Sequence, residues 1–290
     1  MIEDRHIDVG AQRLHAHIGG VDGALPTIVL EAGGGSILPT WSGVEQALAA
    51  QTRVLSYERA GIGESSGPVD SVSAAAVARR LDTLLEASDI RGPLILVGHS
   101  LGGLYMRYYA QTRADRVAGL VLLDTTPQDL PFARFFTVKP TLVLWLLHGL
   151  ARVGVLQWLV KSLTPSGKTA ELSAEHLAAL SRFRHVKTVL GEIGALRQIQ
   201  AEVTALPPAL ALPTLTISAG RHDKRIKPAQ AEHFRRSHEQ LAERGAAPFS
   251  HHQRMQDATH MSMLTDPSQA AIVAATILDF ARQLAQKARA

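Results

Sequence analysis

A serine flanked by glycines lies in the stretch LILVGHSLGGLYMRYYA, residues 94–110. Gly98 and Gly102 each stand two residues from Ser100 in the pattern G-x-S-x-G, between an apolar run typical of a strand and a segment with helical periodicity. A sharp strand-to-helix bend needs glycine where the two elements approach each other, and it exposes the serine hydroxyl on a strained backbone. The stretch therefore predicts a nucleophile at Ser100, and a plain glycine- and serine-rich turn is the alternative.

The elements that must position this serine alternate between strand-like and helix-like periods, with no repeat and no low-complexity tract. Such alternation predicts an α/β fold with a mostly parallel, doubly wound sheet that is covered by helices. The predicted strands span residues 13–18, 27–30, 53–57, 94–97, 117–123, 215–218 and 251–255. The clearest helical patterns span residues 73–87, 101–112, 228–244 and 267–285.

Residues 127–211 interrupt this alternation, because they contain apolar helical stretches and no convincing strand. An excursion between two parallel strands lies over the carboxyl edge of the sheet, where open α/β sheets bind ligands. We therefore expect residues 1–126 and 212–290 to form the core and residues 127–211 to form a helical cap, or lid.

The cap contains a long apolar stretch, residues 141–160, which raises the question of a membrane span. His148 and Arg152 interrupt its middle, and charge there is costly in hydrocarbon, so we expect no transmembrane span. We expect cap helices that line an apolar acyl pocket, and the alternative is peripheral contact between the cap and a lipid surface.

The composition excludes several functional classes. The chain has 290 residues, of which 46% are hydrophobic, as is ordinary for a packed domain, and it has no cysteine for a disulfide, a thiolate metal site or a nucleophile. Its net charge of +4 is dispersed without a basic block, so nucleic acid is not an expected partner. The opening stretch MIEDRHIDVG lacks the basic and apolar regions of a secretory signal, so a cytoplasmic location is expected.

Six stretches of the chain occur in an order that resembles the α/β-hydrolase superfamily, in a serine esterase- or lipase-like branch with a helical cap. They are IVLEAGGGS, VLSYERAGIGESS, LILVGHSLGG, GLVLLD, LTISAGRHD and DATHMSML. The resemblance covers nearly the whole chain apart from the insertion. It implies a nucleophile elbow, an acid after a later strand and a histidine after the last strand.

A serine hydroxyl needs a base that takes its proton and an acid that orients the base. Of the 13 histidines, His260 falls in a short loop between the last predicted strand and the terminal helix, so it is the expected base. Asp223 is the favoured acid, because it follows an apolar strand and matches the acid loop of the family. Asp124, at the end of GLVLLD, is the alternative acid, since some relatives carry the acid there; as a structural residue it would cap the turn into the insertion.

Acyl transfer also requires N–H donors aimed at the developing oxyanion. The backbone N–H of Leu101, at the start of the helix after the bend, is the first expected donor of an oxyanion hole. The resemblance places the second donor at Gly34 in EAGGGS, where Ala32 stands at the position that usually holds histidine. Glu31 and Ser36 are the candidates to support the loop in its place.

The stretch YERAGIGESS resembles a further family loop, in which arginine and glycines brace the region near the nucleophile. We therefore interpret Arg59, Gly61 and Gly63 as structural. A phosphate-binding interpretation of the glycines is disfavoured, because neither G-x-G-x-x-G nor a Walker lysine follows.

Together these features predict a serine hydrolase that cleaves a carboxylic ester of a small to medium apolar substrate through an acyl-enzyme, with no metal and no organic cofactor. A serine at the bend argues against the epoxide hydrolase and haloalkane dehalogenase branches, whose first step needs a carboxylate. Thioesterase, lactonase, amidase, C–C hydrolase and perhydrolase activities use a similar constellation and stay open. A non-catalytic homologue that binds or senses a ligand also stays open. The sequence does not indicate the oligomeric state.

Overall fold

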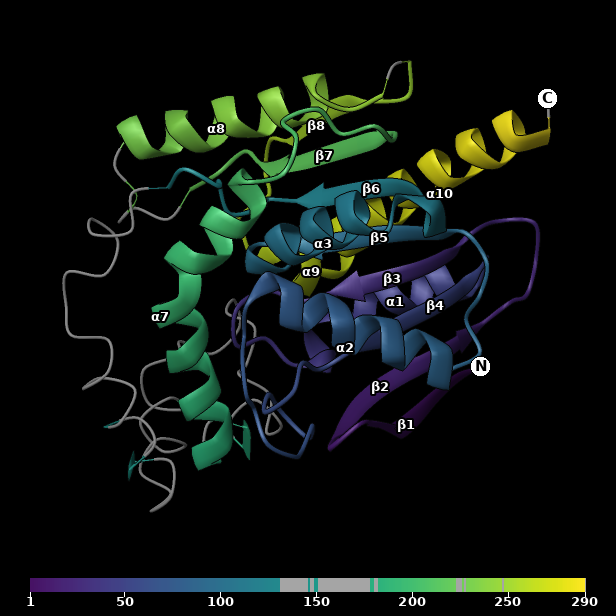
Figure 1. The fold of residues 1–290 in the computed structure, drawn as a ribbon. Helices are drawn as coiled ribbons and strands as arrows, with labels where there is room; N and C mark the ends of the chain where they lie inside the picture. The colour runs from purple at the N-terminus through teal and green to yellow at the C-terminus, as the bar shows by residue number, and fades with distance from the viewer. Residues whose placement is uncertain are drawn as a thin grey trace.

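The computed structural model describes residues 1–130, 146, 149–150, 178–179, 182–222, 226, 228–246 and 248–289 (Figure 1). The strands are β1 (Ile2–Val9), β2 (Gln12–Gly20), β3 (Thr27–Glu31), β4 (Arg53–Tyr57), β5 (Leu94–His99), β6 (Val117–Leu123), β7 (Thr214–Ala219) and β8 (His251–Met255). The α-helices are α1 (Ser42–Ala49), α2 (Ala74–Ala87), α3 (Leu101–Thr112), α7 (Phe183–Thr204), α8 (Pro228–Glu243), α9 (Ser262–Thr265) and α10 (Pro267–Arg289).

The strands form an 8-stranded sheet in the order β1-β2-β4-β3-β5-β6-β7-β8. The pairs β1–β2 and β2–β4 are antiparallel, and the remaining neighbours are parallel. Each predicted strand is present, and the mostly parallel, doubly wound sheet confirms the predicted fold class.

Helices cover both faces of the sheet, with α2 and α3 on one face and α1 and α10 on the other (Figure 1). Every residue of β5 and of β7 is therefore buried, which explains why these strands read as continuous apolar runs. Leu81 and Leu104 pack on the first face, and Leu48 and Phe280 pack on the second.

The strand β1 was not among the predicted strands. Four consecutive residues, Glu3 to His6, are exposed, so the apolar alternation of the strand is limited to the buried Ile7 and Val9 at its end. Its backbone pairs with β2 along its whole length, and its charged side chains suit an edge that must not pair with another chain.

The helix α7 lies beside the carboxyl ends of the strands (Figure 1). Ile199 and Val203 of α7 are buried in the same core cluster as α2 and α3. Among the residues described, no helix is long and apolar enough to cross a membrane, and most of the stretch 141–160 lies outside them.

Candidate active site

Ser100 stands at the bend between β5 and α3 with φ 53° and ψ −120°, a conformation that L-residues rarely adopt. A Cβ on Gly98 would lie 2.6 Å from the Gly102 carbonyl oxygen, and a Cβ on Gly102 would lie 2.4 Å from the Glu31 carbonyl oxygen. Both glycines are therefore required for strand and helix to approach this closely. The Ser100 N–H donates to the Leu123 carbonyl oxygen at 3.1 Å, which ties the bend to the end of β6.

His260 follows β8 and pairs with Asp124 at the end of β6. His260 Nδ1 lies 2.7 Å from Asp124 Oδ2, so Nδ1 donates to the carboxylate and Nε2 is left for another partner. The Asp124 side chain is 5% exposed, whereas that of His260 is 43% exposed. The pair thus has a buried carboxylate at one end and an accessible imidazole at the other.

Asp124 is fixed by its own backbone and by β7. Its φ is 40°, its N–H donates to the Ile217 carbonyl oxygen at 2.7 Å, and its Oδ1 accepts the Ala219 N–H at 3.0 Å. Burial alone would raise the pKa of this carboxyl, but the hydrogen bond and charge of His260 hold the pKa well below its ordinary value. Asp124 is therefore ionised at neutral pH.

The structure describes one of the two predicted acids. Asp124 meets His260, whereas Asp223 lies outside the described residues. Asp124 is the alternative acid predicted from the sequence, and its carboxylate contacts His260.

His99 packs against the imidazole of His260, with ring centroids 4.5 Å apart and an interplanar angle of 34°. Its Nε2 donates to the His260 carbonyl oxygen at 3.0 Å, which holds the loop that carries His260. Burial lowers the pKa of His99 to about 3, so the ring stays neutral and adds no positive charge beside His260.

The loop after β3 runs beside the bend. A Cβ on Gly33 would lie 3.2 Å from Ser100 Cβ, and a Cβ on Gly34 would lie 3.5 Å from Leu101 Cδ2. The structure therefore brings together the residues from which the sequence predicts oxyanion donors.

A buried ion-pair network supports this loop. Arg59 donates from Nη1 to the Ala32 carbonyl oxygen at 2.7 Å and from Nη2 to that of Gly33 at 2.8 Å. The same guanidinium contacts the carboxylates of Glu31 and Glu192, and Arg59 Nε lies 2.7 Å from Glu192 Oε1. Burial opposes the charge, but the two carboxylates outweigh it and raise the pKa of Arg59.

Glu192 joins the network from α7. Its Oε2 accepts the Gly35 N–H at 3.0 Å, so one carboxylate holds both the loop and the arginine that braces it. Of the two side chains expected to replace the missing histidine, Glu31 acts through Arg59; for Ser36 the loop contact is its backbone N–H, which donates to the Gly33 carbonyl oxygen at 3.2 Å.

These residues open onto a cavity of about 700 Å³. Its lining includes Ser100, Leu101, Gly34, Asp124 and His260. The apolar side chains of the lining are Leu130, Val189, Ile193, Leu196, Ile226, Phe234 and Met261. The arrangement offers a hydroxyl, an imidazole oriented by a carboxylate, and backbone N–H groups beside an apolar volume.

The sequence model of the α/β hydrolase fold matches residues 26–267, well over half of the chain. The chain belongs to the α/β-hydrolase fold family. This agrees with the resemblance in the sequence and with the sheet order, and it makes hydrolysis of a small molecule the expected chemistry of the cavity.

The hydrolase is similar to several proteins, whose names differ. It is 33% identical over 203 residues to "Putative carbamate hydrolase RutD" of Klebsiella pneumoniae (strain 342), a match that covers 67% of this chain and 73% of that protein. It is 36% identical over 128 residues to "Probable transporter efuK" of Hormonema carpetanum, which is 42% of this chain but 18% of that protein. The solved structure of Cfl2 from Burkholderia cenocepacia has a TM-score of 0.73 at 23% identity and covers 97% of this chain and 96% of that one, a likeness of fold.

The sequence did not predict that Glu192 contacts Arg59 and the loop after β3 in this hydrolase. The residue is separated from Arg59 by 133 positions, so no spacing pattern links them. Its only signal is a single acid among the apolar residues Val189, Ile193 and Leu196 of one helix.

Proposed function

We propose that this α/β-hydrolase is a serine hydrolase that cleaves a carboxylic ester of a small to medium apolar substrate through an acyl-enzyme. The observation that carries the proposal is the ion pair of His260 with a buried Asp124 in the cavity that also holds Ser100 on a strained bend. The three groups have the roles of nucleophile, base and orienting acid.

In the proposed reaction, Ser100 Oγ attacks the acyl carbon while His260 Nε2 takes the hydroxyl proton. Asp124 holds the imidazole through Nδ1 and stabilises the imidazolium, the role for which Asp223 was first favoured. His260 then protonates the leaving alcohol, the C–O bond breaks, and an ester of Ser100 remains. Water attacks this ester with His260 again as base, which releases the acid and restores Ser100.

The backbone N–H groups of Gly34 and Leu101 are the proposed oxyanion donors. Arg59 and Glu192 are proposed as positioning residues, because they fix the carbonyl groups and the N–H on either side of Gly34. The loop thus has a support that does not depend on the histidine that is absent at Ala32.

The lining of the cavity supports an apolar acyl group, and residues of α7 that fall in the proposed cap, 127–211, contribute part of it. A cytoplasmic location is part of the proposal, and peripheral contact of the cap with lipid stays the alternative to an acyl pocket. The name of the Klebsiella relative favours a carbamate as the second candidate substrate.

The test uses a fluorophosphonate probe and a chain-length series of p-nitrophenyl esters, with a carbamate and an amide of matched acyl length. We expect labelling at Ser100, a preferred chain length, and loss of labelling and turnover in Ser100→Ala. His260→Ala should lose turnover as well, because it removes the base.

The outcome separates the candidates. Turnover of the carbamate without turnover of any ester would replace the ester proposal with the second candidate. Turnover of the amide alone would indicate the amidase activity instead. A folded protein with neither labelling nor turnover would leave a ligand-binding homologue as the better description.

A further inference from the structure

A second group of histidines and carboxylates lies on the antiparallel ribbon β1–β2, at the edge of the sheet. Asp4 of β1 pairs in register with His17 of β2, and His6 pairs with His15. Directly opposed residues of a ribbon share a face, as do residues two apart along a strand, so the four side chains lie together.

Three of these side chains converge. His15 Nε2 lies 2.8 Å from Asp4 Oδ1, and one ligand atom each of Asp4, His15 and His17 lie within 4.8 Å of one another. Ligands around a tetrahedral Zn²⁺ at about 2.1 Å stand about 3.4 Å apart, a separation that falls within the 4.8 Å span of this set.

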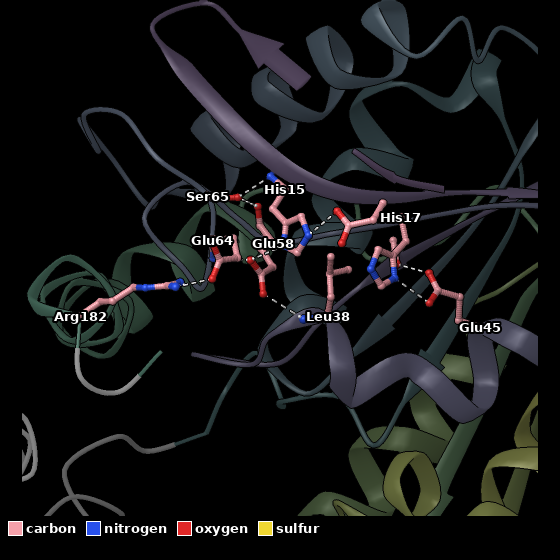
Figure 2. Close-up of polar contacts among 10 residues, drawn as sticks. His15, His17, Leu38, Glu45, Glu58, Glu64, Ser65 and Arg182 are labelled. Carbon is pink, nitrogen blue, oxygen red and sulfur yellow. Dashed lines mark hydrogen bonds and ion pairs between the residues drawn. The ribbon is translucent and has the colours of Figure 1, made fainter. Parts of the chain in front are cut away.

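Each histidine is oriented by a buried carboxylate. Glu58 Oε2 lies 3.0 Å from His15 Nδ1, and Glu45 Oε2 lies 3.0 Å from His17 Nδ1 (Figure 2). Histidines that bind metals have this arrangement, in which a carboxylate accepts the proton of one ring nitrogen and directs the lone pair of the other to the ion.

The orienting carboxylates are themselves fixed. Glu58 accepts the backbone N–H groups of Leu38 and Glu64, and Glu45 accepts the hydroxyl of Ser56. The imidazole rings therefore have defined orientations before any ion arrives.

The charges of the cluster favour a cation. Asp4, Glu45 and Glu58 contribute three carboxylates, and in the part of the chain that the structure describes, their ion pairs are with histidine and not with lysine or arginine. With neutral imidazoles the cluster is negative, and Glu45 and Glu58 are both 3% exposed, so water does little to offset the charge.

From this geometry we propose that Asp4, His15 and His17 bind a divalent transition-metal ion of the Zn²⁺ type. The ligands are a carboxylate oxygen of Asp4, Nε2 of His15 and Nε2 of His17, a donor set that suits Zn²⁺, and water completes the tetrahedron. The ion ties the edge strand β1 to β2 and is separate from the Ser100 cavity, so its role is structural.

The experiment titrates chelator-treated, untagged protein with ZnCl₂ by isothermal calorimetry. The variants are Asp4→Ala and His17→Ala, and the matched control is His251→Ala, which removes an exposed histidine from β8 at the other edge of the sheet. Circular dichroism shows whether each variant is folded. Asp4 is exposed, so its replacement tests the site even where His17→Ala does not fold.

We expect one equivalent of Zn²⁺ in the wild type and in the control, and affinity about 100-fold weaker in Asp4→Ala and His17→Ala. Zn²⁺ should raise the Tm of the wild type and the control but not that of the two variants, and ester hydrolysis should be unchanged in Asp4→Ala. The proposal is overturned by the absence of stoichiometric binding to the wild type. Equal affinity in the wild type and Asp4→Ala would overturn it as well.

Discussion

Two regions of this molecule pair a buried carboxylate with an imidazole in different surroundings. At the carboxyl edge of the sheet, buried Asp124 contacts Nδ1 of His260. On the β1–β2 ribbon, buried Glu58 and Glu45 contact Nδ1 of His15 and His17. In both places a carboxylate orients an imidazole so that its other nitrogen has a defined direction.

The regions differ in what the second nitrogen meets. His260 lines a cavity with a serine hydroxyl, a group that can give up a proton to it. His15 Nε2 meets a carboxylate oxygen of Asp4, a group that attracts a cation. An oriented imidazole is therefore not by itself evidence of catalysis, and the third group decides between proton transfer and ion binding.

The largest expected effect comes from Asp124→Asn. The amide can donate to Nδ1 and favour the wrong tautomer of His260, so kcat/KM for the preferred ester should fall by about 10⁴-fold. Asp223→Asn is the matched control, for which we expect a change of less than about threefold. A large loss in the control with little loss in Asp124→Asn would return the role of acid to Asp223.

The choice between Asp124 and Asp223 shows which parts of the fold and the site the sequence can predict. The parallel strands were predictable because burial on both faces makes them continuous apolar runs, as in β5 and β7. Asp124 and Asp223 both follow such strands in the sequence, so position along the chain does not separate them. The separation needs the direction of the side chain, and Asp124 acquires its direction from a positive φ and from the Ala219 N–H.

The ion-binding cluster was not predictable for a related reason. Because Glu3 to His6 of β1 are exposed and polar, the apolar alternation of the strand is limited to its end, and Asp4 could not be placed beside His15 and His17. The adjacent histidines His251 and His252 do not form such a cluster, because they are neighbours on β8, where successive side chains point to opposite faces.

The second prediction concerns Glu192→Gln, which removes the charge that pairs with Arg59 and leaves an amide oxygen for the Gly35 N–H. The loop that carries Gly34 loses part of its support, so kcat should fall by about 30-fold with little change in KM, less than the loss of an oxyanion donor. Glu202→Gln on the same helix is the control, because Glu202 accepts the Ala74 N–H and does not contact the loop. Equal kcat in both variants would remove Glu192 from the positioning residues.

The third prediction concerns the effect of His99 on the pH dependence of the free energy of unfolding. The pKa of His99 is lowered to about 3, whereas His17, beside Glu45, has a raised pKa. A histidine with a lowered folded pKa takes up its proton only when the chain unfolds, so its contribution to stability is lost as pH falls below about 6.5.

The effect of His99 is isolated by comparison with His99→Gln, which keeps a donor for the His260 carbonyl oxygen. Between pH 6.5 and 5.0 the free energy of unfolding of the wild type should fall by about 2 kcal/mol more than that of the variant, measured by urea denaturation. The same pH dependence in both proteins would mean that His99 is accessible to protons in the folded state.

The smallest expected effect is that of Glu45→Gln on the ribbon, and it tests whether the likeness between the regions is functional. If the carboxylate orients His17 for an ion as Asp124 orients His260 for a proton, the neutral amide should weaken Zn²⁺ binding by about tenfold. Glu86→Gln, an exposed acid on α2, should bind Zn²⁺ as the wild type does. Unchanged affinity in Glu45→Gln would mean that the carboxylate only supports the fold at this edge, and the comparison would then hold for Asp124 and His260 alone.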